Sequence, residues 1–294
     1  MKKNKKIALV LSGGGAKGSF QNGAEKTARM EFGYQWDYIA GVSTGALNAI
    51  MLAMGKYGDL NRLWETITEK QIMTGSKAWY RVLLRVARKK LSIYDNKPLR
   101  QLLSRHVDPS KIRVEKLMIG VVDIISGQFI DVFQYWDRLL DYIVASTAIP
   151  VFFSPVEIGG NWFVDGGVRN VSPLGSVIKY DPDEIVIINC SDPDTIGTGK
   201  PPKSMIDVAT RSLQILTNEA FKNDLSEFLR INALVKQAEA QSAILRKENG
   251  DPYKYFKCTL IEPTENLGET LDFNREVLNR RIQHGIDRAR AVLS

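Results

Sequence analysis

Short apolar runs rich in β-branched and aromatic residues alternate with longer stretches of helical periodicity along this chain. The runs predict strands at Ile7–Leu11, Tyr38–Ala40, Leu117–Asp123, Phe129–Phe133, Trp162–Val164, Ile185–Asn189 and Phe256–Ile261. The periodic stretches predict helices at Lys17–Glu31, Gly45–Met54, Trp79–Lys90, Pro98–Arg105, Arg138–Thr147, Met205–Arg246 and Asn274–Leu293. Because strands alternate with helices, the pattern indicates an α/β architecture with a largely parallel sheet.

Turn-forming residues add two features to this picture. Ser126-Gly127 and Gly159-Gly160-Asn161 are typical of tight turns between antiparallel strands, so we expect a mixed sheet. The segment Asp192–Lys203, rich in Pro, Gly, Thr and Asp, predicts a long surface loop. This loop separates a motif-bearing core, residues 6–191, from a helix-rich C-terminal part, residues 192–294, which we expect to pack on the same domain.

A serine flanked by glycines lies between a predicted strand and a predicted helix, in Gly41-Val42-Ser43-Thr44-Gly45. This context is typical of a nucleophile elbow, a sharp turn that exposes the serine while small flanking residues avoid side-chain clashes. The helix that follows places its positive end beside the reacting oxygen. The alternative interpretation is a glycine-rich turn whose serine only caps the helix.

A second glycine motif, Gly13-Gly14-Gly15-Ala16-Lys17-Gly18, follows the first predicted strand and opens a helix. Consecutive glycines allow backbone N–H groups to turn toward an anion. Such a loop serves either as an oxyanion hole or as a dinucleotide-binding turn, for which Asp37 lies roughly 20 residues on, where a ribose-binding acid is expected. The oxyanion hole is favoured because the second strand leads directly to Ser43, which dinucleotide binding does not require.

The third motif, Asp165-Gly166-Gly167, comes at the end of a predicted strand. An aspartate that leaves a strand beside two glycines has little bulk around it, as a base that approaches a serine needs. Alone, Asp-Gly-Gly is more often an ordinary turn. Its combination with the other two motifs is what favours a catalytic role.

The three motifs in this order resemble the patatin-like phospholipase family. The resemblance extends to Ala145-Ser146-Thr147-Ala148-Ile149-Pro150 with Phe152, Phe153, Pro155 and Val156, and to Asn170 and Pro173. It implies a three-layer α/β/α fold with a mixed, largely parallel central sheet. It also implies a Ser-Asp dyad that hydrolyses acyl esters of phospholipids, lysophospholipids or neutral lipids without calcium, another metal or a cofactor.

The resemblance also assigns roles to residues of this chain. Ser43 is expected to be the nucleophile and Asp165 the base, with the N–H groups of Gly13, Gly14 and Gly15 as the oxyanion hole. The residues that support these motifs are Lys17, Gly18, Gly41, Thr44, Gly45, Gly166 and Gly167. From about Pro201 onward no motif of the family is recognisable, so elements that select the substrate there cannot be carried over.

Three rival interpretations remain open. Ser43, Asp165 and His284 occur in the chain order of a Ser-Asp-His α/β-hydrolase. That fold is disfavoured because it places several strands before the elbow, whereas this sequence has one clear strand before the strand that leads to Ser43. Both histidines, His106 and His284, lie in polar surroundings that predict surface positions. The other two rival interpretations are a nucleotide-binding protein that uses the Gly13 to Gly18 loop and a non-catalytic scaffold.

Composition changes this picture little. Of 294 residues, 44% are apolar and 25% charged, an ordinary globular balance. Cys190 and Cys258 lack the spacing of a metal site or a disulfide framework, which favours a reduced, cytoplasmic setting. The apolar run Ile7–Leu11 is too short for a signal peptide, and no stretch approaches the ~18 to 20 apolar residues that span a bilayer.

The net charge of +7 favours anionic partners, either phospholipid surfaces or nucleic acid, and the resemblance selects lipid over nucleic acid. Within Trp79 to Leu91, helical periodicity gathers four basic residues on one face and apolar residues on the other; the basic residues are Arg81, Arg85, Arg88 and Lys89. This pattern indicates either a helix packed on the core with a solvated basic face or one that contacts an anionic membrane surface peripherally.

Overall fold

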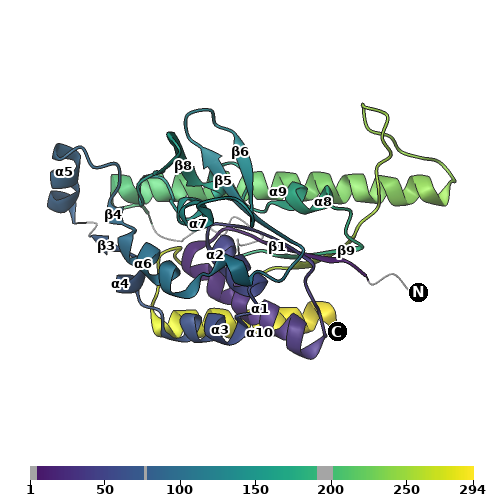
Figure 1. The fold of residues 1–294 in the computed structure, drawn as a ribbon, viewed down its shortest axis with the longest axis horizontal. Helices are drawn as coiled ribbons and strands as arrows, with labels where there is room; N and C mark the ends of the chain where they lie inside the picture. The colour runs from purple at the N-terminus through teal and green to yellow at the C-terminus, as the bar shows by residue number, and fades with distance from the viewer. Residues whose placement is uncertain (1–4, 76–77, 191–200) are drawn as a thin grey trace.

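A computed structural model describes residues 5–75, 78–190 and 201–294 of the chain. Within these residues the centre of the protein is a sheet of eight strands in the order β10-β9-β1-β2-β5-β8-β7, with β6 also paired to β5 (Figure 1). The strands are β1 (Ile7–Leu11), β2 (Tyr38–Val42), β5 (Lys116–Asp123), β6 (Phe129–Phe133), β7 (Val156–Ile158), β8 (Asn161–Asp165), β9 (Glu184–Ile188) and β10 (Lys257–Ile261). β10, β9, β1, β2 and β5 are parallel, whereas β6, β7 and β8 run antiparallel to their neighbours. The prediction of a mixed, largely parallel sheet is confirmed.

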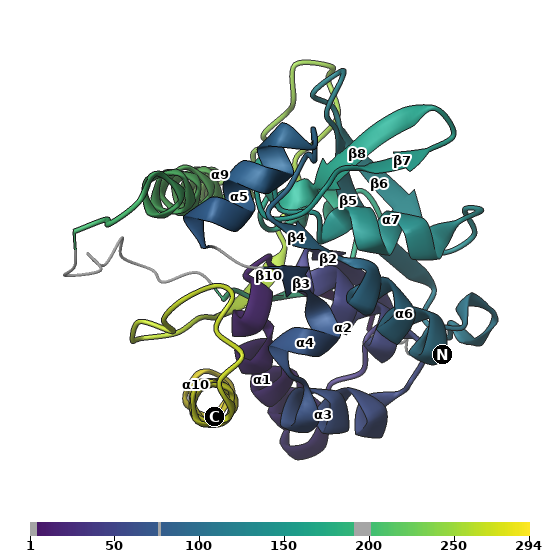
Figure 2. The ribbon, with the colours of Figure 1, turned by 90° about the vertical axis from the view of Figure 1, so that its left-hand side faces the viewer.

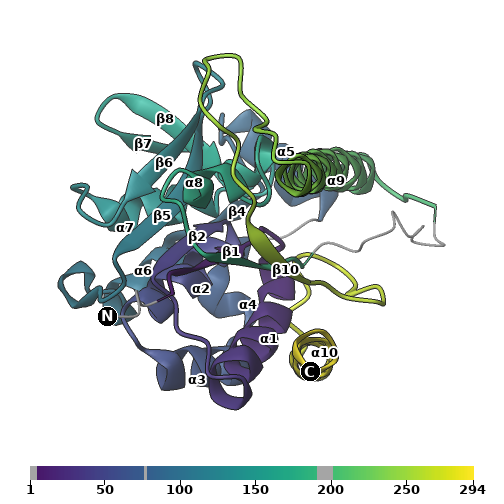
Figure 3. The same ribbon diagram turned by 90° about the vertical axis from the view of Figure 1, so that its right-hand side faces the viewer.

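Alternate residues of the strands face two separate apolar layers. In β1, Leu9 and Leu11 pack into a layer with α1 (Gly18–Glu31), α2 (Thr44–Ala53) and α10 (Arg275–Leu293). Ala8 and Val10 pack into the opposite layer, with α8 (Leu174–Ile178) and the 36-residue α9 (Met205–Ala240). Figure 3 shows these helices on opposite faces of the sheet. The three-layer α/β/α fold follows from this period-2 alternation of apolar residues.

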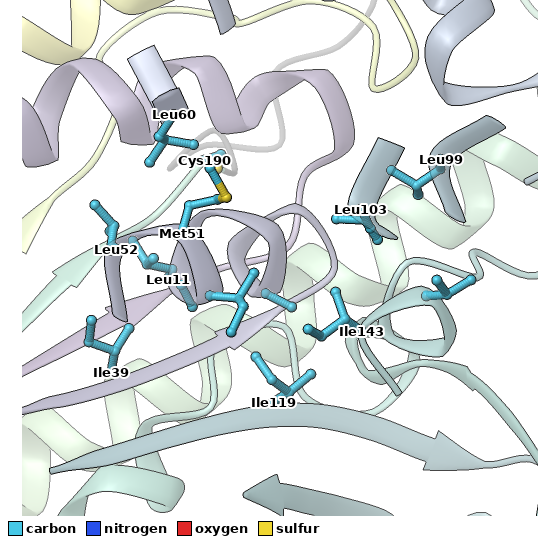
Figure 4. Packing of buried hydrophobic residues seen from close by; sticks show 14 of the residues in the cluster. Leu11, Ile39, Met51, Leu52, Leu60, Leu99, Leu103, Ile119, Ile143 and Cys190 are labelled. Carbon is cyan, nitrogen blue, oxygen red and sulfur yellow. The ribbon is translucent and has the colours of Figure 1, made fainter. Parts of the chain in front are cut away.

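The layer that contains α2 is the larger of the two. Residues of β1, β2 and β5 meet residues of α2, α6 (Lys97–His106) and α7 (Leu139–Ser146), as Figure 4 shows for Leu11, Ile39, Met51, Leu103 and Ile143. α2 has almost no exposed side chain, because it lies between the sheet and the helices α3 (Tyr57–Thr66) and α6. The serine that precedes α2 is therefore anchored on a buried helix.

Several short elements were not predicted. They are α3, α4 (Glu69–Ile72), α8, β7 and the two-residue strands β3 (Thr74–Gly75) and β4 (Tyr94–Asp95). The first two turns of α3 contain Gly58, Asp59 and Asn61, which are poor helix formers. The helix forms nevertheless, because Leu60 and Trp64 are buried. α5 (Trp79–Ala87) and α9 end earlier than predicted. Residues 192–200 of the predicted surface loop lie outside the described residues.

Two elements of the C-terminal part of the chain, β10 and α10, join the central sheet and the apolar layer that contains α1 and α2. β10 pairs with β9, and α10 lies along α1 (Figure 1). The two helices approach at glycines: a Cβ at Gly285 would lie 2.1 Å from the carbonyl oxygen of Phe20, and one at Gly23 would lie 2.1 Å from that of Ile282. Only glycine permits backbones to pack this closely.

We expect Gly285→Ala to lower the free energy of unfolding by about 1–3 kcal/mol, because the added methyl group forces α1 and α10 apart. Gly58→Ala in α3 is the matched control, since no atom lies within 4 Å of its added Cβ, and it should be neutral or stabilising by up to about 1 kcal/mol. Urea denaturation of both variants measures the difference. Equal effects of the two substitutions would contradict the close helix contact.

Candidate active site

Ser43 and Asp165 are brought together by two strands that meet end to end on one edge of β5. Val42, the last residue of β2, pairs with Gly120, and Asp165, the last residue of β8, pairs with Val121. β6 occupies the opposite edge of β5, so β2 and β8 share the remaining one. Because successive residues of a strand are only ~3.3 Å apart, the residue after β2 and the last residue of β8 become neighbours.

Ser43 occupies a turn with an unusual backbone conformation, φ 56° and ψ −125°. Such a conformation costs a non-glycine residue about 1–3 kcal/mol and persists only where the surroundings fix it. Here Ser146 contributes: its hydroxyl oxygen accepts the Ser43 N–H at 3.0 Å and its hydroxyl group donates to the Gly120 carbonyl at 2.7 Å. The structure thus has the geometry of a nucleophile elbow. The part that Ser146 plays in it was not recognised from the sequence, although Ser146 lies in one of the family-like segments.

The glycines of the serine and aspartate motifs lie where neighbouring backbone leaves no room for a side chain. An added Cβ would lie 2.4 Å from the Gly45 carbonyl oxygen at Gly41, 2.3 Å from the Leu11 carbonyl oxygen at Gly45 and 2.5 Å from the Gly120 carbonyl oxygen at Gly166. Gly18 is crowded in the same way by the Thr44 side chain. These residues therefore serve close packing of the turns around Ser43, whereas the motif position Lys17 lies in the 3-10 turn Gly15–Lys17.

Asp165 is 4% exposed and interacts with two donors. The Gly167 N–H donates to its carboxylate at 2.8 Å, and the Ser43 side chain forms a hydrogen bond with it. Burial raises the pKa of this carboxyl group from 3.8 to about 7, although the hydrogen bonds from Ser43 and from the Gly167 backbone act in the opposite direction. A carboxylate with this pKa is a far stronger base than a solvent-exposed aspartate.

The glycine loop lies directly beside the serine. A Cβ at Gly13 would lie 3.2 Å from the Ser43 Cβ. The N–H of Gly13, however, already donates to the Val171 carbonyl oxygen at 3.0 Å. In the part of the chain that the structure describes, the N–H groups of Gly14 and Gly15 donate no hydrogen bond, so these two are the members of the predicted trio that remain open to an anion.

An apolar cavity of about 90 Å³ is lined by Ser43 and Gly15. Most of its wall consists of aliphatic and aromatic side chains from α2, α3, α4 and α6 and from the loops that precede β7 and α10. Representative wall residues are Leu47, Met51, Leu60, Trp64, Leu99 and Leu103. A cavity of this composition beside a nucleophile can hold a hydrocarbon chain and has few groups to solvate a polar one.

The residues that the rival interpretations need are not arranged for them. The imidazole Nε2 of His284 accepts the Thr264 N–H at 3.1 Å, and its ring lies against Phe20. His106 is half-buried and contributes to the wall of the cavity, but the carboxyl partner of Ser43 is Asp165 and not an imidazole. Both histidines are half-buried, so the prediction of surface positions holds in part: each is partly exposed and also packs against apolar neighbours.

Asp37 is placed at the wrong end of the sheet for a ribose-binding acid. Its carboxylate accepts the Ile7 N–H at 2.9 Å, at the start of β1. The glycine loop follows the other end of β1, about 17 Å away at ~3.3 Å per residue. The dinucleotide interpretation therefore loses the residue that supported it.

The structure does not place the four predicted basic residues on one helical face, because Arg81 and Arg85 lie in α5 whereas Arg88 and Lys89 lie in the turn that follows it. Arg85 donates hydrogen bonds to the carbonyl oxygen and the hydroxyl group of Ser92, so its side chain is folded against its own loop. Arg81, Arg88 and Lys89 are exposed. α5 lies beside the N-terminal end of α9, away from α1 and α10 (Figure 2).

Comparisons with known proteins agree with this geometry. A family model described as patatin-like phospholipase matches residues 9–178. The probable lipid hydrolase 463L of Invertebrate iridescent virus 6 is 24% identical over 195 residues, which are 58% of this chain and 63% of that protein, so the chain spans less than two thirds of this relative. The crystal structure of VipD from Legionella pneumophila shares the fold with a TM-score of 0.51 and 15% identity, over 99% of this chain and 67% of VipD.

The matched region covers more than half of the chain and contains the glycine loop, Ser43 and Asp165. The structure places Gly15 and Ser43 in the wall of one cavity and Asp165 beside Ser43. The chain belongs to the patatin-like phospholipase family.

Proposed function

We propose that this protein is a lipid acyl hydrolase of the phospholipase A or lysophospholipase type that works through an acyl-enzyme on Ser43. The observation that carries the proposal is the hydrogen bond between Ser43 and the buried Asp165, beside an apolar cavity. Membership of the patatin-like phospholipase family and similarity to a probable lipid hydrolase support a lipid ester as the substrate.

The reaction follows from the positions of these groups. The Asp165 carboxylate accepts the Ser43 proton while the serine oxygen attacks the ester carbonyl, and the negative charge that forms on the carbonyl oxygen is held by the N–H groups of Gly14 and Gly15. Asp165 then gives the proton to the departing alcohol. A water molecule, activated by the same carboxylate, hydrolyses the acyl-enzyme and restores both residues.

The dyad makes different demands on Asp165 and on the two histidines. We expect Asp165→Asn to reduce ester hydrolysis on the order of 1,000-fold or more, because the carboxylate that accepts the Ser43 proton is lost. His284→Ala and His106→Ala should each retain most of the activity. Initial rates on a soluble short-chain ester measure all three variants.

Ser43→Ala is the control for this series, and a fluorophosphonate probe should label the wild-type protein at Ser43 and not this variant. Circular dichroism establishes that each variant is folded. A folded His284→Ala enzyme that is slowed as much as Asp165→Asn would overturn the dyad and restore the triad of an α/β-hydrolase.

The raised pKa of Asp165 predicts the pH dependence of the reaction. Asp165 acts in its ionised form, so kcat/KM should increase about tenfold per pH unit below pH 7 and level off above it. A pH–rate profile measured with an uncharged ester reports the pKa of the free enzyme. An ascending limb near pH 4, the range of an unperturbed aspartate, would show that the carboxyl group is not desolvated as in the structure.

The raised pKa of Asp165 also predicts that the protein loses stability over the pH range in which its activity rises. Because the folded protein binds this proton more tightly than the unfolded chain, the stabilisation is complete below about pH 4 and is lost as the pH rises toward 7. Asp165→Asn has no proton to lose. Its melting temperature relative to the wild-type protein should therefore be higher at about pH 8 than at about pH 5.

We also propose that α5 contacts an anionic membrane surface. Arg81 of α5, with Arg88 and Lys89 in the turn that follows, supplies positive charge. Tyr80 and Leu84 of α5 are 51% and 52% exposed. In the described part of the chain, no helix is both long enough and apolar enough to cross a bilayer. Exposed apolar residues next to basic ones favour the interfacial interpretation of α5 over a helix whose apolar face is fully packed on the core.

Charge reversal tests this contact. The variant Arg81→Glu/Arg88→Glu/Lys89→Glu should bind liposomes with anionic lipid at least about tenfold more weakly, since each basic residue near the surface contributes ~1 kcal/mol. The control Lys26→Glu/Lys247→Glu/Arg280→Glu alters net charge equally at exposed positions outside α5. Cosedimentation at low and high salt compares them. Equal loss of binding in both variants would remove α5 from the proposal and leave only net charge.

A further inference from the structure

A loop of the C-terminal part of the chain, which the family model does not match, lies beside the candidate active site. This loop, residues 267–273, is part of the connection between β10 and α10 and lies against the glycine loop. Its Thr270 carbonyl oxygen accepts the Ala16 N–H at 2.7 Å. The same oxygen would lie 2.3 Å from a Cβ at Gly15. The loop therefore packs directly against the turn at Gly14 and Gly15, whose N–H groups we propose as the oxyanion donors.

The 267–273 loop also forms part of the wall of the apolar cavity. Leu271 and Phe273 line it together with Ser43. On the other side, the Gln214 side-chain amide of α9 donates a hydrogen bond to the Thr270 hydroxyl oxygen at 3.2 Å. The loop therefore touches the glycine turn, the cavity and α9 at once.

The loop has little regular structure of its own and is held by an arginine from α10. Arg281 is 0% exposed. Its guanidinium group donates to three carbonyl oxygens of the loop, those of Leu267 at 2.7 Å, Glu269 at 2.8 Å and Asp272 at 3.0 Å. A planar group with five donors in fixed directions sets the path of a backbone in a way that a single ammonium group cannot.

A second arginine of the same helix holds the opposite wall. Arg275 donates to the carbonyl oxygens of Trp64 at 2.7 Å and Ile67 at 2.8 Å, where α3 ends. Both of these residues line the cavity. α10 is thus connected to two sides of the cavity and, through its glycine contact with α1, to the helix that follows the glycine loop.

We propose that Arg281 is a positioning residue for the acyl-transfer reaction: it holds the 267–273 loop so that Thr270 orients the Gly15 turn and Leu271 and Phe273 set the acyl-chain preference. This inference rests on the proposed function and names the element that selects the acyl group. Loss of the guanidinium group leaves three carbonyl oxygens of this partly buried loop without the donors that hold them, so the loop shifts away from both the turn and the cavity.

The test compares Arg281→Met with Arg288→Met in the full chain. Arg288, on the same helix, also donates to a backbone carbonyl, that of Glu262 at 2.9 Å, but does not contact the 267–273 loop. We expect Arg281→Met to lower kcat about 100-fold, the scale of a misplaced catalytic group, and Arg288→Met to leave kcat within about threefold. Arg281→Lys should recover part of the loss. Rates are measured on p-nitrophenyl esters of increasing chain length, normalised to folded protein.

A purely structural role predicts a different result. If Arg281→Met lowers the melting temperature but keeps kcat and chain-length preference per folded molecule, the proposal is overturned. Fluorophosphonate labelling of Ser43 in wild-type protein reports on the proposed function alone, whereas the difference between the two methionine variants reports on positioning.

Leu271→Ala decides the question independently of the folding of Arg281 variants, because it leaves the guanidinium contacts in place. Removal of this side chain enlarges the cavity, so the preferred ester should become longer by two or more carbons while Ser43 labelling continues. An unchanged chain-length preference would overturn the assignment of the 267–273 loop as the element that selects the acyl group.

Discussion

The burial of the Asp165 carboxyl group is the constraint on which the rest of the site depends. A carboxylate in a dry environment is basic enough to accept a serine proton at neutral pH, but it is also costly to ionise. The protein limits this cost with the hydrogen bonds from Ser43 and the Gly167 N–H. Ser43 is within reach because β2 and β8 meet end to end on β5, whereas the Gly167 N–H comes from the turn directly after Asp165. The order of the strands and the basicity of the aspartate are therefore one property of the fold.

Much of this arrangement was predictable because it depends on local sequence patterns. Seven of the eight strands that the structure describes in the central sheet were identified from short apolar runs, whereas β7 was missed, and the motif glycines were expected at tight turns. The sequence also placed Ser43 after a strand and Asp165 at the end of one, but only the structure shows that these two strands meet end to end on β5. The short elements α3, α4 and α8 were missed because tertiary burial, as of Leu60 and Trp64, outweighs their weak local preference.

What could not be predicted depends on contacts between residues far apart in sequence. No pattern near Gly13 reveals that its N–H is taken by Val171, or that the Ser146 hydroxyl group holds the serine turn. Asp37 had the spacing of a ribose-binding acid, yet strand direction places it at the opposite end of the sheet. Arg281 belongs to a polar helical stretch in the sequence, and its complete burial follows only from the loop that folds over it.

The connection between α10 and the glycine turn also relates to the order in which the chain is synthesised. Ser43 and Asp165 are synthesised before Thr270 and Arg281, which follow them in the chain. N-terminal segments generally begin to fold while the remainder is still being made. A nascent chain can therefore carry the serine and the aspartate before the 267–273 loop has been synthesised. Under the role that we propose for this loop, the site gains its full reactivity only after α10 has docked and Arg281 has bound the loop.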